Sequence, residues 1–98
     1  MDITQEKVRE LFELDEVVGM LFWKVQLSSR GLVGAVAGSL CKGESDDRWY
    51  IKIAGKSYLR SRLIFLFLYG YLPKMVDHVD RNSLNDRPYN LRDTNTSQ

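Results

Sequence analysis

The sequence predicts an α+β fold in which an N-terminal and a central helix pack against a small antiparallel sheet. Apolar residues recur at helical spacing over residues 8–12, alternate with polar ones over 49–53, and form an unbroken run over 63–69. The first pattern is typical of a helix, the second of a half-buried strand and the third of a buried helix. The chain is long enough for one core but too short for two, so we expect residues 1–98 to form a single domain.

The N-terminal part is expected to be a helix followed by a strand. Thr4 can cap a helix, and an acid follows in the first turn, so the helix should run from there to about Asp15. Gly19 marks a turn, and residues 20–24 are expected to form a strand. The small apolar residues 32–40 suit either a strand or a loop.

The middle of the chain contains the clearest elements. Residues 48–60 are expected to form a hairpin that turns at 54–56. A buried helix should follow over 61–69, because Gly70 stands where a helix often ends and Pro73 blocks continuation.

The C-terminal part is expected to contain a strand, a loop and a helix. Residues 74–79 form the predicted strand, and the polar residues 80–88 form the predicted loop. Asn90 is placed to start a final helix.

The composition excludes several classes of protein. Cys41 is the only cysteine, which excludes an internal disulfide framework and every zinc site built from several thiolates. The N-terminus lacks the basic and apolar segments of a signal peptide. The apolar run 63–69 is far shorter than the roughly 20 residues of a membrane-spanning helix. We therefore expect a cytoplasmic protein with no zinc and no membrane partner.

Charge is unevenly distributed along a chain whose net charge is only +1. Residues 1–23 hold six acids and two bases, whereas residues 48–76 hold six bases and no acid. The six bases are Arg48, Lys52, Lys56, Arg60, Arg62 and Lys74. Such a segment is either a footprint for a polyanion or a solvated strand face. Arg60 and Arg62 would contact phosphates or pair with the acidic N-terminal helix.

His78, the only histidine, lies directly after Asp77 and two positions before Asp80. A single histidine is most often structural or simply exposed. A calcium loop starting at Asp80 is excluded, because the required glycine and glutamate are missing. A zinc protease helix needs two histidines, and no Gly-x-Ser-x-Gly segment supports a serine hydrolase.

Metal-assisted cleavage of a phosphodiester would give Asp77, His78 and Asn90 each a role. Adjacent strand residues point to opposite sides, so Asp77 and His78 can serve two sides of one bond. Asp77 would hold a divalent cation through oxygen, and His78 would take a proton from water. Asn90 would fix the loop or the orientation of the imidazole.

At these residues the sequence resembles the HNH endonucleases of phages and mobile elements, which have the ββα-metal fold. The family pattern is similar to Asp-His-x-Asp-Gly-Asn-x-x-Asn-Asn-x-x-x-Asn-Leu-Arg. Residues 77–92 read DHVDRNSLNDRPYNLR, with the same spacing throughout. The resemblance implies that His78 is the general base, Asp77 a metal ligand and Asn90 the middle residue that stabilises the loop.

The resemblance extends over nearly the whole chain. Residues 1–72 look like the AP2-like helix and hairpin often found with this family, and residues 73–98 look like the C-terminal ββα-type motif. The resemblance implies a DNA endonuclease that depends on Mg²⁺ or Mn²⁺. The expected DNA-binding residues are Lys52, Lys56, Arg60, Arg62 and Arg92.

Three positions depart from the family pattern. Arg81 replaces a glycine, Asp86 replaces an asparagine, and Ser61 replaces a histidine that many relatives carry. The resemblance places the family's last metal ligand at position 99, just past Gln98. Gln98 or Asn95 is the alternative ligand, although neither has the family spacing.

These departures leave a second hypothesis beside the endonuclease. It is a non-catalytic, HNH-derived phage protein that binds DNA or inhibits a host defence or nucleic-acid enzyme.

Overall fold

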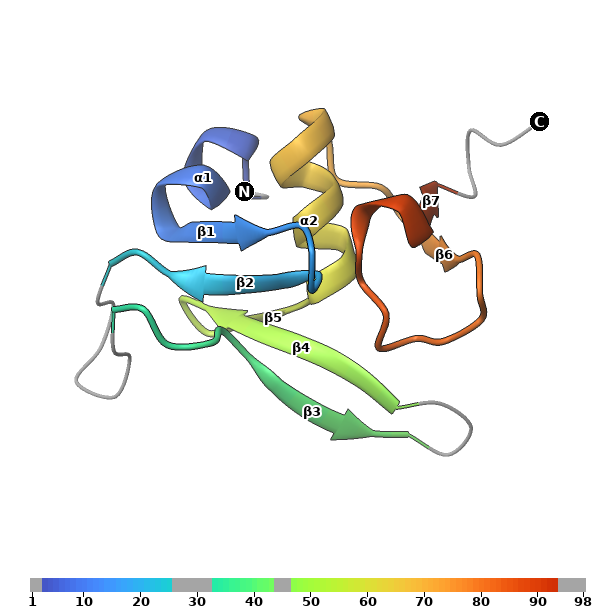
Figure 1. Ribbon diagram of the computed structural model, residues 1–98. Helices are drawn as coiled ribbons and strands as arrows, with labels where there is room; N and C mark the ends of the chain where they lie inside the picture. The colour runs from blue at the N-terminus through green and yellow to red at the C-terminus, as the bar shows by residue number, and fades with distance from the viewer. Residues whose placement is uncertain (1–2, 26–32, 44–46, 94–98) are drawn as a thin grey trace.

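The computed structural model describes residues 3–25, 33–43 and 47–93. These residues form three antiparallel sheets with strand orders β1-β2, β3-β4-β5 and β6-β7, and two α-helices (Figure 1). The elements in chain order are α1 (Gln5–Leu11), β1 (Phe12–Asp15), β2 (Met20–Trp23), β3 (Ser39–Lys42), β4 (Asp47–Ile53), β5 (Lys56–Leu59), α2 (Arg60–Tyr69), β6 (Val76–His78), the 3-10 turn Pro88–Asn90 and β7 (Leu91–Asp93). The predicted α+β class is confirmed.

The first helix is shorter than predicted. The Thr4 hydroxyl accepts a hydrogen bond from the Lys7 backbone at 3.2 Å, as expected of a cap. The helix nevertheless ends at Leu11, and residues 12–15 pair with β2 as a strand. The prediction of a helix to Asp15 is wrong because this pairing buries Phe12 against Trp23, with the ring centroids 4.6 Å apart.

The predicted hairpin is confirmed as β4 and β5. Its turn places Ala54 at φ 50° and Gly55 at φ 84°, the pair of positive values that suits the twist of a two-residue hairpin. β3 pairs with the other edge of β4. For the segment 32–40, which suited either a strand or a loop, the structure gives both. Residues 33–38 are irregular except for one bridge from Val36 to Phe22, residues 39–40 belong to β3, and residue 32 lies outside the described part.

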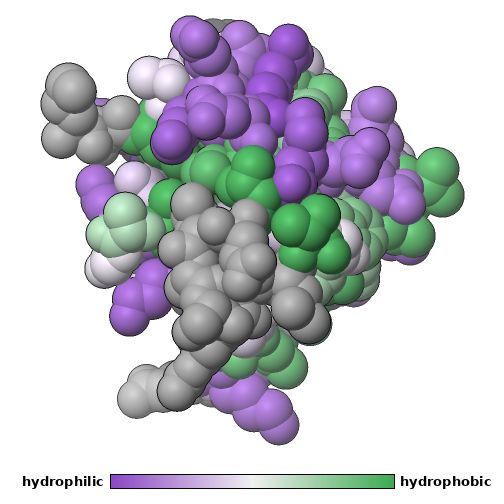
Figure 2. All heavy atoms as spheres, turned by 90° about the vertical axis from the view of Figure 1, so that its left-hand side faces the viewer, coloured by the Kyte–Doolittle hydropathy of each residue, from purple (hydrophilic) through white to green (hydrophobic). Residues whose placement is uncertain are grey.

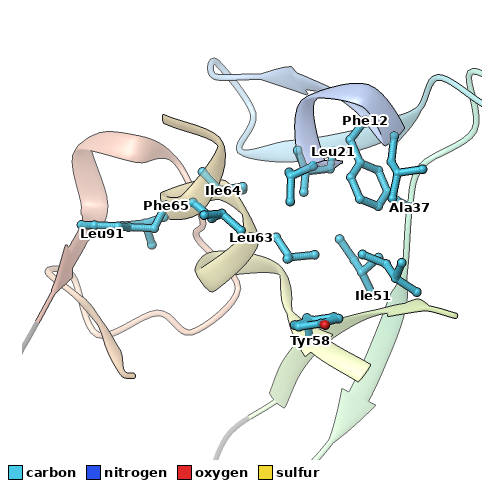
Figure 3. Close-up of a cluster of buried hydrophobic side chains, with 13 residues drawn as sticks. Phe12, Leu21, Ala37, Ile51, Tyr58, Leu63, Ile64, Phe65 and Leu91 are labelled. Atoms are coloured by element: carbon cyan, nitrogen blue, oxygen red, sulfur yellow. The ribbon is translucent and has the colours of Figure 1, made fainter. Parts of the chain in front are cut away.

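The central helix α2 joins the two halves of the core. Its residues from Leu63 to Leu66 are buried, as predicted, and Gly70 ends it at φ 86° by donating to the Leu66 carbonyl. Figure 3 shows Leu63 on the side of α2 that faces Ile51, whereas Phe65 lies beside Leu91. The hairpin and the C-terminal unit therefore pack on the same helix.

The C-terminal unit differs from the prediction after Asn90. Leu91 and Asp93 are buried and alternate with exposed Arg92, and β7 pairs with β6. A helix starting at Asn90 is wrong for these residues, because alternate burial requires strand geometry. Residues 94–98, where a helix would continue, lie outside the described part. No helix among the described residues is long and apolar enough to cross a membrane.

Candidate nuclease site

A pocket of about 350 Å³ opens beside β6. It is lined by Arg48, Met75, Val76, Asp77, His78, Arg81 and Ser83. The Ser83 hydroxyl donates to the backbone oxygen of Asp47, which ties the loop after β6 to the start of β4. Asp77 and His78 therefore border one cavity together with the basic end of the hairpin.

The imidazole of His78 is held by a buried carboxylate. Its Nε2 lies 2.7 Å from Oδ1 of Asp86, and the two side chains are 13% and 2% exposed. The other oxygen of Asp86 accepts from Nε of Arg60 at 2.7 Å, and the Arg60 side chain is 3% exposed. Asp86 thus joins a buried cation to the only histidine of the chain.

Arg60 has further contacts that fix its guanidinium in place. Nη2 donates to the Leu84 carbonyl at 3.0 Å, and the guanidinium carbon lies 4.7 Å from the centroid of the Trp49 ring. Arg60 was expected to bind DNA or to pair with the acidic first helix. The structure instead buries it on Asp86, so it is not part of a DNA-facing surface.

Asn90 organises the loop that follows His78. Its Oδ1 accepts from the Asp80 backbone, and its Nδ2 donates to Oδ1 of Asp80 and to the Asn85 carbonyl, each at 2.9 Å. Hydrogen bonds from the Asn85 side chain, the Asn82 backbone and the Asn90 side chain, in that order, lower the pKa of Asp80 below its ordinary value of 3.8. Of the two roles expected for Asn90, these hydrogen bonds fit the one in the loop, and they do not reach the imidazole.

Asp77 offers one oxygen ligand for a metal. The described residues contain no group of three His, Cys, Asp or Glu side chains that could hold a metal ion. One carboxylate fits Mg²⁺ or Mn²⁺, because such hard cations take their remaining ligands from water and phosphate oxygens. A cation there would replace Arg92, whose Nη2 donates to Oδ2 of Asp77 at 2.6 Å. Asn95 and Gln98 lie outside the described residues.

The other residues expected to bind DNA do not share one surface. Lys52 is exposed on β4, whereas Lys56 lies on the opposite face of the hairpin, 5.4 Å from the Tyr58 ring. Arg62 is half-buried and donates to the Pro73 carbonyl at 2.7 Å. Arg92 is exposed but paired with Asp77. Of these residues, Lys52 shares a strand face with the pocket residue Arg48, and Arg92 contacts the pocket residue Asp77.

Sequence reasoning missed three residues of this site. Asp86 was noted only as a departure from a pattern, and Arg48 and Arg81 had no assigned role beside His78. Only Arg81 could have been noticed from the sequence, because it stands where the family pattern has glycine. Its φ of 66° explains the preference for glycine, because this backbone region costs other residues about 1–2 kcal/mol.

Comparison with known proteins gives one match, to a family model. A family model described as HNH endonuclease matches residues 58–97, a segment that includes α2 and the whole loop from His78 to Asn90. No curated protein and no solved structure matches the chain. The match does not cover residues 1–57, so the AP2-like character of the N-terminal part stays a prediction.

Proposed function

We propose that this protein, whose residues 58–97 match the HNH endonuclease family model, is a metal-dependent DNA endonuclease with His78 as its general base. The observation that carries the proposal is the arrangement around the pocket. A histidine held by a buried carboxylate borders the same cavity as Asp77 and two arginines. A base, an oxygen ligand and cationic side chains are the groups that phosphodiester hydrolysis uses.

In the proposed reaction, a ring nitrogen of His78 takes a proton from a water molecule whose oxygen attacks phosphorus. The bond from phosphorus to the opposite sugar oxygen breaks, and solvent protonates that oxygen. Arg48 and Arg81 would neutralise charge on the phosphate. Asp77 would hold Mg²⁺ or Mn²⁺, which when bound supplies charge stabilisation at the leaving oxygen. The protein would act in the cytoplasm, that of the host cell if the gene is carried by a phage.

In this proposal, DNA binds along the outer face of the β3-β4-β5 sheet, which ends at the pocket. Arg48, Tyr50 and Lys52 alternate along β4, so they share the face opposite the buried Ile51 and Ile53. We name these three residues the basic strand face. Its two cations are exposed, and Arg48 also lines the pocket. A phosphate backbone bound along this face would therefore lead to His78.

Nicking of a supercoiled plasmid tests the proposed function. The purified chain is incubated with DNA in Mg²⁺, in Mn²⁺ or in EDTA, at protein concentrations that saturate the plasmid. Nicked circles are expected with either metal and not with EDTA. Plasmid that stays supercoiled in both metals would contradict an endonuclease.

The second candidate function is non-catalytic binding. It is favoured by the occupation of the Asp77 carboxylate by Arg92 and by the absence of a three-ligand group among the described residues. Exposed acids at Glu6, Glu10 and Glu13 offer a surface for a host defence or nucleic-acid enzyme. Figure 2 shows hydrophilic side chains gathered over the upper part of the face where α1 lies in Figure 1.

Two titrations separate the forms of this second candidate. A DNA-binding module would bind duplex DNA tightly without nicking it. An inhibitor would bind a host enzyme in a pull-down and lose that binding when Glu6 and Glu10 are changed to lysine. Nicking that depends on His78 would exclude both.

A further inference from the structure

We infer that Asp86, held by Arg60, is a positioning residue that keeps the proton of the neutral His78 ring on Nε2 and leaves Nδ1 as the nitrogen that accepts a proton. The catalytic part of this inference rests on the proposed function. The position of the proton on the His78 ring does not, because it can be measured on the protein without DNA. It assigns a role to two residues that the family pattern does not place at the site.

The first step is the charge of Asp86. The carboxylate and the guanidinium of Arg60 are both almost completely buried, at 2% and 3% exposure, with 2.7 Å between Oδ2 and Nε. A buried guanidinium stays charged, and it needs an anion beside it in a medium of low dielectric constant. Asp86 is therefore the anionic partner of Arg60 in a buried ion pair.

The second step is the direction of the hydrogen bond to His78. An ionised carboxylate has no proton to donate, so Oδ1 of Asp86 can only accept. The contact with Nε2 at 2.7 Å therefore requires a hydrogen on Nε2. In the neutral ring, the second nitrogen then carries a free lone pair.

The third step is why an amide at this position would behave differently. An asparagine presents an oxygen on one side and an NH₂ group on the other, so it can turn either of them toward Nε2. With the NH₂ group turned that way, the ring would carry its proton on Nδ1. An amide would also leave the Arg60 guanidinium buried without an anion. Asp86 and Arg60 therefore act together to select one form of the ring.

The test is an NMR measurement on chain labelled with ¹⁵N-histidine, made in the alkaline range where the two ring ¹⁵N shifts no longer change with pH. One histidine in the chain means one pair of ring nitrogens, so the assignment is unambiguous. We expect Nε2 to carry the proton, in preference to Nδ1 by about tenfold or more, as a charged hydrogen bond provides. We also expect that proton to be visible directly, because a buried hydrogen bond protects it from exchange with water.

The variant D86N should weaken or reverse this preference and remove the protected signal. Glu13→Gln makes the same change of carboxylate to amide at an exposed position of β1 and should leave the ring signals unchanged. A wild-type ring with its proton on Nδ1, or without a protected Nε2 proton, would overturn the inference even if D86N does not fold. A folded D86N protein with the wild-type ring spectrum would overturn it equally.

The measurement contains no DNA, so its outcome is independent of the proposed function. A protein with the expected ring spectrum that never cleaves DNA would remove the endonuclease and keep the positioning role. Cleavage of DNA by a protein whose neutral His78 ring carries its proton on Nδ1 would keep the endonuclease and remove the positioning role.

Discussion

Asp80 is the side chain around which the loop after His78 is arranged. Its Oδ2 accepts from Nδ2 of Asn85 at 2.7 Å, and its Oδ1 accepts from the Asn82 backbone at 2.8 Å and from Nδ2 of Asn90 at 2.9 Å. Three donors on one carboxylate favour its ionised form, which is why the pKa of Asp80 lies below 3.8. The loop geometry therefore depends on a charge that acid removes.

This charge predicts how the loop responds to acid. Because the pKa is lower in the folded chain than in the unfolded one, Asp80 contributes stability above the ordinary value of 3.8, and that contribution is lost as the pH falls through the folded value. Asn85→Ala removes the donor with the largest effect, so the pKa of Asp80 should rise toward 3.8. A carboxyl ¹³C titration by NMR measures this directly.

Asn82→Ala is the matched control for this titration. It deletes an amide side chain of the same kind but keeps the backbone N–H that donates to Asp80. The pKa of Asp80 should stay near its wild-type value in this variant. Equal shifts in the two variants would mean that loop disorder, and not the Asn85 hydrogen bond, controls the titration.

The positions of some site residues could be predicted from nearby sequence. Asp77 and His78 lie on the strand expected over residues 74–79, and Asn90 lies in the loop network that the family pattern implied. The role of Asp86 did not, because its contact with Arg60 joins positions that are 26 residues apart. Only the approach of α2 to the loop brings them together.

At the scale of elements, the β1–β2 turn packs against the loop segment that contains Asp86 and Arg87. Gly19 has φ +73°, and a Cβ at this position would lie 2.5 Å from the Arg87 nitrogen and 2.6 Å from the Asp86 carbonyl carbon. Nε of Arg87 also donates to the Val17 carbonyl at 2.8 Å. The turn thus packs directly against the backbone of the residue that holds His78.

Gly19→Ala should therefore destabilise the fold. The added Cβ would clash with the backbone of residues 86 and 87, and the positive φ would strain an alanine. Together these effects should lower the free energy of unfolding by about 2–4 kcal/mol, as measured by denaturant titration. Gly55→Ala is the control, because Gly55 has φ +84° with nothing within 4 Å of the added Cβ. It should lose only the backbone part, about 1–2 kcal/mol. Equal losses at the two glycines would mean that the turn does not press on the loop.

The basic strand face predicts how DNA binding depends on salt. Lys52→Glu should weaken binding to duplex DNA of any sequence, because phosphate contacts carry no sequence information. The slope of log binding constant against log salt concentration should fall by about 0.9 for each phosphate that the protein no longer neutralises. Lys7→Glu makes the same charge change on α1 and should alter the slope less. Binding that is indifferent to salt would exclude this face as the DNA surface.

Elements with a strong local pattern were predicted correctly, whereas two short segments whose structure depends on pairing were not. The β4–β5 hairpin and α2 carry their periodicity and their turn residues in consecutive positions. Residues 12–15 and 91–93 are too short to show a reliable period, and they become strands because β2 and β6 lie beside them. Tertiary pairing overrides local preference in both segments.

At the scale of the whole molecule, one polar junction connects the hairpin, the central helix and the C-terminal loop. Arg60 begins α2, stacks near Trp49 of β4 and binds Asp86 of the loop. The apolar core also connects α2 with β7, through Phe65 and Leu91, both buried. The α+β class followed from composition and periodicity, whereas this junction required the relative placement of three segments.

The central claim is that His78 performs the chemistry on a phosphodiester bound along the basic strand face. Single-turnover cleavage of labelled duplex DNA, with protein in excess and Mg²⁺ present, tests it most directly, because saturation separates the chemical step from binding. His78→Ala should bind DNA as tightly as wild type and cleave it about 10²–10⁴ times more slowly, the usual contribution of a general base. Equal single-turnover rates for the two proteins would contradict the account.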